Sequence, residues 1–288
     1  MTGIATNCGS ATWPEIAAGM RRYLALLCHP DGDIAFFNDA ARGIAPLPAD
    51  LEQYAARLEL AGIDRSRDGL THLGDSGYIR MADKNAVALL DVAPIGPDYL
   101  PGHAHADTLS FELALFGRRV LVNSGTSEYG TDAERLRQRG TPAHNTVTIN
   151  NADSSEVWGG FGVGRRARPL GLWVGNSDHT MKVSCSHDGY SRLSGRPVHR
   201  RFWHLGPGRL TVTDFGLARL SDDVTVTQAK KAGAAEAAVE RLDAAIAEEV
   251  AIVVVGNHPT CGPNMGQEWT SGGDTQPCSD PGEGREGR

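Results

Sequence analysis

Apolar residues recur at helical spacing near the start of the chain. Residues 13–28 (WPEIAAGMRRYLALLC) and 49–61 (ADLEQYAARLELA) both follow this pattern, which predicts two helices. Pro14 suits the first turn of a helix, where no amide hydrogen is needed. The segment between the helices, HPDGDIAFFNDAARG, reads as a loop with a short apolar insert.

From about Gly77 to Phe215 the period changes to two, in short runs separated by Gly, Pro, Asn and Asp. In residues 109–116, apolar positions alternate with Ser110, Glu112 and Ala114, as in a strand that buries one face. Eight or more short strands without intervening helices predict an antiparallel β-sandwich, so the fold class is mainly β. The predicted strands are Tyr78–Met81, Ala86–Val92, Thr108–Phe116, Arg119–Asn123, Asn145–Ile149, Leu170–Val174, Lys182–Ser186 and Arg209–Asp214.

The residue composition and the hydrophobic pattern change again near Gly216. Residues 229–247 are rich in Ala, Glu and Lys and predict a helix, and the apolar run 251–255 follows. The remaining tail is polar and rich in Gly and Pro, so we expect it to be disordered. This end does not look like a continuation of the sandwich. A truncated gene or a shifted reading frame would produce such an end.

Composition and charge narrow the class of protein. Glycine accounts for 35 residues and aromatics for 6% of the chain, which favours a turn-rich β architecture over a helical bundle. The net charge of -7 argues against a nucleic-acid binder, which would usually carry a basic face. An anionic polysaccharide needs only local cations, and the chain has such a group in Arg135, Arg137, Arg139, Arg165, Arg166 and Arg168.

Cysteine usage and hydropathy exclude further classes. The chain has five cysteines, an odd number without CxxC spacing, so neither a disulfide framework nor a cysteine zinc site is predicted. The first residues show no basic segment followed by an apolar one, so no signal peptide is visible. No apolar run approaches the roughly 20 residues that a transmembrane helix needs.

The stretch Gly102-His103-Ala104-His105-Ala106-Asp107 carries the clearest chemical signal. In an extended strand, residues at i, i+2 and i+4 share one face, so both imidazoles and the carboxylate could converge. Two histidines at this spacing can bind zinc, or one can bind a metal while the other transfers protons. The alternative is a run of polar residues on a solvated strand.

A series of motifs in fixed order makes the signal more specific. GHxHAD is followed by LVNSGTSxYG, QRGTxAHNTVxI, DSSEVWGGF, HDGY and HRRFW. This order resembles the C-terminal domain of the heparinase II/III family of polysaccharide lyases. The resemblance covers roughly residues 20–215, and residues 29–58 are similar to the last turns of that family's helical toroid.

The resemblance implies cleavage of an acidic, uronate-containing polysaccharide by β-elimination. It assigns the catalytic histidine that reaches into the cleft to His103. It also implies a structural zinc ion, with His105 and His144 as ligands. The remaining family ligand is an aspartate, and this chain has Asn123 there. Because an amide brings no negative charge, we expect a lower zinc affinity.

Arg135, Arg139 and Asn145 are the candidate substrate-binding residues, since arginine recognises carboxylates through two parallel hydrogen bonds. A solvated face is the alternative for these arginines. Asp107 could orient one of the histidines.

The catalytic tyrosine and the group that neutralises the uronate carboxylate come from the toroid in this family. One or two helices in residues 1–60 cannot supply that domain, so we expect weak or no activity from this chain alone and a missing toroid as its partner. The predicted organisation is a toroid remnant at 1–70, a sandwich at 71–220 and an atypical end at 221–288. The resemblance implies a periplasmic or cell-envelope location.

Two other functions remain open. A non-catalytic sandwich could bind polysaccharide or dock on another subunit. An unrelated metal-dependent oxygenase could use His103, His105 and His144, with Asp107 as the carboxylate of a 2-His-1-carboxylate set.

Several other side chains are expected to be structural. Trp158 and Trp203 read as core, Cys185 as a buried thiol, and His199 and His204 as surface residues. Residues 187–190 (HDGY) read as a turn.

Overall fold

The computed structural model describes residues 11–63, 68–177, 180–206 and 209–215, together with the backbone of 226–227 and 253–255. These residues belong to one compact unit, Met1–Asn257. The helix predicted at 229–247 and the tail expected to be disordered lie outside the described residues. Among the described helices, none has the length and apolar character that crossing a bilayer requires.

Two helices open the described chain, as the apolar spacing predicted. Helix α1 (Trp13–Leu26) starts at a capping box, in which the Glu15 carboxylate accepts hydrogen bonds from the backbone N–H and hydroxyl of Thr12. Helix α2 (Pro48–Arg57) has proline in its first turn. The Arg21 guanidinium joins the two helices through two hydrogen bonds to Glu52, of 2.9 and 2.6 Å.

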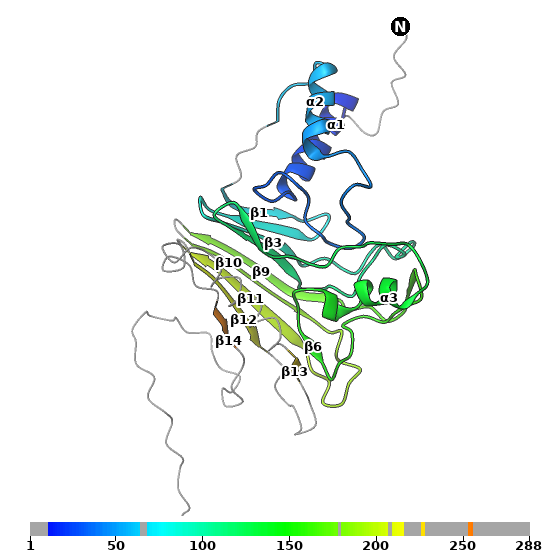
Figure 1. The fold of residues 1–288 in the computed structure, drawn as a ribbon. Coiled ribbons are helices and arrows are strands. Elements are labelled where there is room, and N and C mark those ends of the chain that lie inside the picture. Colours follow the sequence, from blue (N-terminus) through cyan, green and yellow to red (C-terminus); the bar gives the residue numbers. More distant parts are fainter. Residues whose placement is uncertain are drawn as a thin grey trace, which may run out of the picture. The chain divides into compact units, whose positions relative to one another are not determined.

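The first sheet is an antiparallel meander whose spatial order follows the chain (Figure 1). Its strands are β1 (Gly69–Leu73), β2 (Tyr78–Ala82), β3 (Ala86–Asp91), β4 (Phe111–Leu115) and β5 (Arg118–Leu121).

The second sheet has the order β14-β12-β11-β10-β9. It contains β9 (Pro169–Ser177), β10 (Thr180–His187), β11 (His199–Gly206) and β12 (Arg209–Phe215), all antiparallel. Strand β14 (Val253–Val255) joins in parallel beside β12. The apolar run 251–255 therefore contributes a strand to this sheet, although the sequence did not indicate that this end of the chain continues the sandwich.

Shorter elements connect the two sheets. Strand β6 (Thr148–Ile149) pairs with β13 (Val226–Thr227), and β7 (Val157–Trp158) forms a hairpin with β8 (Gly162–Val163). Helix α3 (Ala133–Arg139), followed by the 3-10 turn η1 (Thr141–Ala143), was not predicted, because three arginines hide its apolar pattern. Asp132 caps α3 by accepting a hydrogen bond of 2.9 Å from the backbone N–H of Arg135.

The core combines side chains from both sheets, as a sandwich requires. Ile79, Leu90 and Leu113 from the first sheet cluster with Val183 and Trp203 from the second, and each is at most 1% exposed. This arrangement confirms the mainly β, antiparallel fold class. Trp203 and Cys185 are both fully buried, as expected.

Strand β4 is buried on both faces, so the expectation of a single buried face was wrong. The outward side chains Glu112 and Ala114 are covered by the loop after α1. His29 Nε2 lies 2.7 Å from Glu112 Oε2, and the Phe36 N–H donates to Glu112 Oε1 at 3.0 Å. A chain segment distant in sequence therefore covers a face that the local pattern assigned to solvent.

Two other expectations are corrected. Trp158 is 57% exposed, because it lies on the short β7–β8 hairpin, outside both sheets. His199 is fully buried, because its side chain binds the buried Asp214 at 2.7 Å. His204 is exposed, as expected.

Candidate functional site

The two histidines of the GHxHAD motif lie in the loop between β3 and β4, not on the strand that the spacing suggested. Their rings nevertheless bind one carboxylate, that of Asp39. His103 Nδ1 lies 2.9 Å from Asp39 Oδ2, and His105 Nε2 lies 2.8 Å from Asp39 Oδ1. Because Asp39 belongs to the loop between α1 and α2, this carboxylate joins the helical segment to the sandwich.

Asp39 also binds a buried arginine and a hydroxyl. Arg135 Nη2 donates to Asp39 Oδ2 at 2.9 Å, and Nη1 donates to Oδ1. The Thr126 hydroxyl donates to Oδ1 at 3.1 Å. We call Asp39, His103, His105, Thr126 and Arg135 the Asp39 cluster.

Asp39 stays ionised in this environment. Burial raises the pKa of the Asp39 carboxyl, but hydrogen bonds from His105, Arg135 and His103 outweigh burial and hold that pKa well below its usual range. An ionised carboxylate only accepts hydrogen bonds, so His103 must carry its proton on Nδ1. In the neutral form of the ring, Nε2 then presents a lone pair.

His103 is the exposed member of the cluster. Its side chain is 68% exposed, whereas those of His105 and Arg135 are fully buried. An imidazole with one nitrogen fixed by a carboxylate and the other open to solvent is suited to transferring protons to and from a bound molecule.

A pair of stacked aromatic rings lies beside His103, and Tyr129 is the member that contacts it. The Tyr129 ring lies 6.1 Å from the His103 ring, edge to face, and stacks on Phe161 at 6.1 Å. The Arg135 guanidinium lies 5.1 Å from the Tyr129 ring centre. Burial, then the negative charge of Asp39, raises the pKa of Tyr129, so its phenol stays protonated at neutral pH. Tyr129 and Phe161 are 52% and 47% exposed, so this wall is open to a ligand.

The proposed zinc ligands lie close together. The ring centres of His105 and His144 are 5.2 Å apart. Two imidazoles bound to one zinc ion at about 2.1 Å would place their ring centres roughly 5 Å apart. His105 Nδ1 is buried and has no hydrogen-bond partner among the described residues. Both imidazoles therefore fit a zinc ion.

Asn123 fits less well as the third ligand. Its Oδ1 accepts a hydrogen bond of 3.1 Å from the backbone N–H of Asn145, next to His144 in sequence. In the described part of the chain, no group of three His, Cys, Asp or Glu side chains is arranged to hold a metal. The donor set is two imidazoles and one neutral amide.

Asp107 does not hydrogen-bond to the histidines, and Asp39 takes the orienting position instead. The Oδ2 atom of Asp107 accepts a long hydrogen bond of 3.4 Å from the Asn38 N–H. Complete burial raises the pKa of Asp107 to about 6, and burial together with the Asp107 charge raises that of Asp91.

The three candidate substrate-binding residues all bind protein groups. Arg135 also donates to the Gly160 carbonyl at 3.0 Å, and Arg139 donates to the Ala104 carbonyl at 3.2 and 3.0 Å. Asn145 Nδ2 donates to the Phe111 carbonyl at 3.0 Å. Arg135 and Arg139 are fully buried, so the solvated-face alternative is wrong for them. Their substrate-binding role stays a prediction.

The HDGY and HRRFW motifs form a second, fully buried cluster. His187 Nε2 lies 3.1 Å from His199 Nδ1, and His199 Nε2 lies 2.7 Å from Asp214 Oδ1. Arg201 donates to the same carboxylate at 2.6 and 2.9 Å. Burial lowers the pKa of both histidines, so they are neutral at pH 7. These side chains cross-link strands and have no access to a ligand.

The sequence did not point to Asp39, Tyr129 or Phe161 as members of the site. Tyr129 and Phe161 lie inside quoted motifs, LVNSGTSxYG and DSSEVWGGF, which was the available signal. Asp39 lies in a segment read as a loop, 64 residues before His103, and nothing local marks it as a partner.

The comparison with known protein families agrees with the motif series. Residues 65–236 match the family model described as "Heparinase II/III-like, C-terminal". The solved structure of heparan sulfate lyase HepC from Pedobacter heparinus is 18% identical with a TM-score of 0.47, and the alignment covers 63% of this chain and 29% of HepC. A structure of heparinase III is 17% identical with a TM-score of 0.47, over 65% of this chain and 32% of that one. The chain thus spans about a third of the length of these two structures. No curated protein matches.

Proposed function

Because the chain belongs to the heparinase II/III-like family through its C-terminal domain, we propose that it serves as the β-sandwich part of a lyase that cleaves acidic polysaccharides by β-elimination. The observation that carries this proposal is His103, whose exposed ring is held by the ionised Asp39. The solved structures carry the names heparan sulfate lyase and heparinase III, which suggests a glycosaminoglycan as the kind of substrate.

In the proposed reaction, the proton at C5 of a uronate is removed, the C4–O bond breaks, and its electron pair leaves with the oxygen. The C5–H electron pair becomes the C4–C5 double bond, and the leaving oxygen takes up a proton. His103 Nε2 can accept the C5 proton or return one to the leaving oxygen. The imidazolium formed in between keeps its Nδ1–H on Asp39, whose negative charge stabilises it.

Arg135 acts in this scheme through Asp39. Its buried guanidinium fixes both carboxylate oxygens, so the carboxylate cannot turn away from His103. Arg139 fixes the carbonyl of Ala104, between the two histidines of the loop. We propose that the second proton-transfer group and the group that neutralises the uronate charge come from a helical toroid, whose last turns residues 29–58 resemble.

We further propose a structural zinc ion between His105 and His144, with Asn123 as a weak third ligand. Bound zinc would tie the β3–β4 loop to the segment after α3, and so hold His103 in place. Support comes from the 5.2 Å ring separation and the unpaired Nδ1 of His105. Family membership is also the support for proposing a periplasmic or cell-envelope location.

A direct test supplies the chain with a helical toroid domain of this family and measures ultraviolet absorbance during incubation with uronate polymers, since elimination creates a conjugated C4–C5 double bond. We expect the His103→Ala variant to lose about 100-fold or more of the rate, as removal of a proton-transfer group does. His72→Ala, at an exposed position on β1, is the matched control and should keep the rate. A rate that survives His103→Ala would refute the proposal. Retarded migration in polysaccharide gels without absorbance would instead indicate a non-catalytic binding sandwich.

A further inference from the structure

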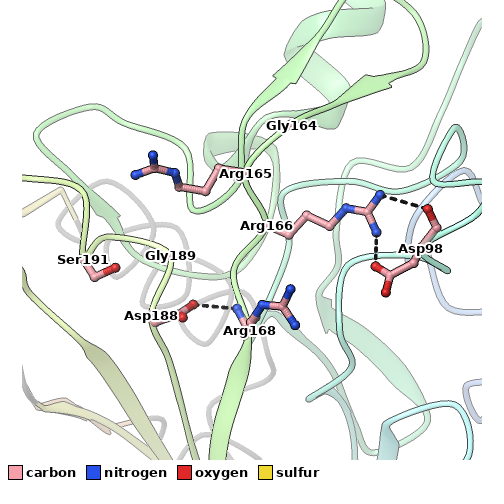
Figure 2. Close-up of a pocket in the computed structure, with 8 residues that line it drawn as sticks. All are labelled: Asp98, Gly164, Arg165, Arg166, Arg168, Asp188, Gly189 and Ser191. Carbon is pink, nitrogen blue, oxygen red and sulfur yellow. Dashed lines mark hydrogen bonds and ion pairs between the residues drawn. The ribbon is translucent and has the colours of Figure 1, made fainter.

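A pocket of about 360 Å³ lies beside the β7–β8 hairpin, and its volume is in the range of small-molecule sites (Figure 2). Its lining includes Arg165, Arg166 and Arg168, together with Asp98, Asp188 and Ser191. We call it the arginine pocket. None of its arginines belongs to the Asp39 cluster.

Two of the three arginines have cationic groups available for a ligand. Arg166 Nη1 binds Asp98 Oδ1 at 2.6 Å, and Figure 2 shows its side chain turned toward Asp98 while Arg165 points away. In the part of the chain that the structure describes, the guanidinium groups of Arg165 and Arg168 make no hydrogen bond or ion pair, and both residues are exposed.

The backbone that carries these arginines is held on both sides. The Arg165 N–H donates to Glu156 Oε2 at 3.2 Å, and the Arg165 carbonyl accepts from the Glu156 N–H at 2.8 Å. The Arg168 N–H donates to Asp188 Oδ1 at 2.8 Å. Gly189 keeps the neighbouring turn tight, since a Cβ there would lie 2.3 Å from the Ser154 carbonyl oxygen. Fixed backbones reduce the entropy lost when a ligand binds.

The arginine pocket and the Asp39 cluster share two chain segments. Asp98 precedes His103 by five residues, a span of at most about 18 Å in extended chain. Phe161, in the aromatic wall beside His103, lies at the turn of the hairpin that leads to Arg165. The Phe161 Cβ also lies 3.6 Å from where a Cβ on Gly102 would be, so loop and hairpin are in contact.

We infer that the arginine pocket binds the anionic substituent, carboxylate or sulfate, of a second sugar unit on the polysaccharide that reaches His103. The class of ligand rests on the proposed function, whereas the site itself rests on the two available guanidinium groups and the fixed backbone. Arginine matches both oxyanions, because its planar fork offers parallel N–H groups.

The test measures calorimetric binding of the full chain to two probes, a sulfated heparin oligosaccharide and an oligogalacturonate that carries carboxylates alone. We expect Arg165→Ala/Arg168→Ala to weaken binding roughly ten-fold or more. Asp98→Asn should tighten binding several-fold, because it releases Arg166. The matched control is Arg22→Ala/Arg57→Ala, which removes two exposed arginines from α1 and α2 and should leave the affinity unchanged.

A loss for both probes identifies the carboxylate as the bound group, and a loss for heparin alone identifies sulfate. Equal losses in the pocket and control variants, unchanged binding in the pocket variant, or no binding of either probe would overturn the inference. Absorbance assays separate this result from the proposed lyase function. If the pocket variant loses binding while the wild-type chain, supplied with a toroid domain, forms no unsaturated product, the pocket stands and the lyase proposal loses its support.

Discussion

Asp39 holds His103, His105 and Arg135 through its two carboxylate oxygens. Arg135 is fully buried and Asp39 is 6% exposed, so their ion pair is shielded from solvent. Replacing the carboxylate by an amide would leave the Arg135 charge buried without a counter-charge, and would also release His103 from its charged acceptor.

We therefore expect Asp39→Asn to lower the free energy of unfolding by about 3–5 kcal/mol, the usual cost of breaking a buried ion pair. Urea denaturation measures this loss. Asp31→Asn is the matched control, since Asp31 pairs with Arg119 at a more exposed position and its loss should cost about 1 kcal/mol or less. Equal losses of unfolding free energy in the two variants would show that Asp39 stabilises the fold no more than a surface ion pair does.

The zinc proposal is tested at Asn123. The Asn123→Asp variant restores a charged ligand beside His105 and His144, so we expect more zinc per chain and a larger rise in the melting temperature on adding zinc than in the wild-type chain. Without zinc, the buried charge should lower the melting temperature. Elemental analysis and thermal melts with and without chelator measure both effects. The control is Asn176→Asp on the exposed side of β9, and a variant at Asn123 that gains no more zinc than this control contradicts the proposed ligand set.

At the level of single residues, the sequence alone located part of the site. His103 and His105 share Asp39, and His105 lies beside His144, so the histidines singled out from the motifs do gather in one region. Asp39 could not be predicted, because its contacts span 64 to 96 residues and its own segment shows no periodic pattern. The burial of Arg135 could not be predicted either, because a buried guanidinium needs a counter-charge and the Asp39 carboxylate comes from the loop between α1 and α2.

Among the elements, the second sheet contains the clearest pH-sensitive group. The Gly189 N–H donates to His187 Nδ1, and His187 Nε2 therefore donates to His199. His187 must be neutral for this chain of hydrogen bonds to form. Burial is the main cause that lowers its pKa well below the usual value, and the positive charge of Arg201 adds to it. Its contribution to stability is thus present above pH 6.5 and is lost as pH falls toward the folded-state pKa.

We expect His187→Leu to show a weaker dependence of unfolding free energy on pH between about pH 6.5 and 5 than the wild-type chain, by up to about 1.4 kcal/mol per pH unit. Asp91 and Asp107 act in the opposite direction, since their raised pKa values favour the fold at lower pH, so the comparison between variants is the observable. Urea titrations at several pH values measure it. The exposed His72→Leu is the control, and identical slopes in wild type and His187→Leu would exclude His187 as the acid-sensitive group.

Local pattern placed many of the strands, but β1, β7 and β8 were not among the predicted strands. The alternating runs at β2, β3, β9, β10 and β12 became strands near their predicted positions. Helix α3 and the double burial of β4 were missed, because both depend on contacts with distant segments. Arg135 and Arg139 of α3 read as part of a polar stretch, because Asp39 and the Ala104 carbonyl, which bind them, lie far away in sequence.

On the scale of the whole molecule, the sandwich serves as a scaffold whose loops present the chemistry. The β3–β4 loop carries His103, the segment before α3 carries Tyr129, and the β7–β8 hairpin carries Trp158 and Phe161. These aromatic side chains are all about half exposed, which suits contact with sugar rings. The fold class was predictable from the period of two, whereas the strand order and the loop contacts depend on register and long-range pairing that a single sequence does not display.

We propose that an acidic polysaccharide binds over His103, whose side chain is exposed, whereas the side chain of His105 is fully buried. Nuclear magnetic resonance of the ten histidine rings during titration with an unsulfated uronate oligosaccharide tests this most directly. His103→Ala identifies the relevant signal. We predict a saturable shift of the His103 signal, with the signals of the buried His187 and His199 unchanged. A His103 signal that does not move while other rings respond would show that the polysaccharide does not bind over His103.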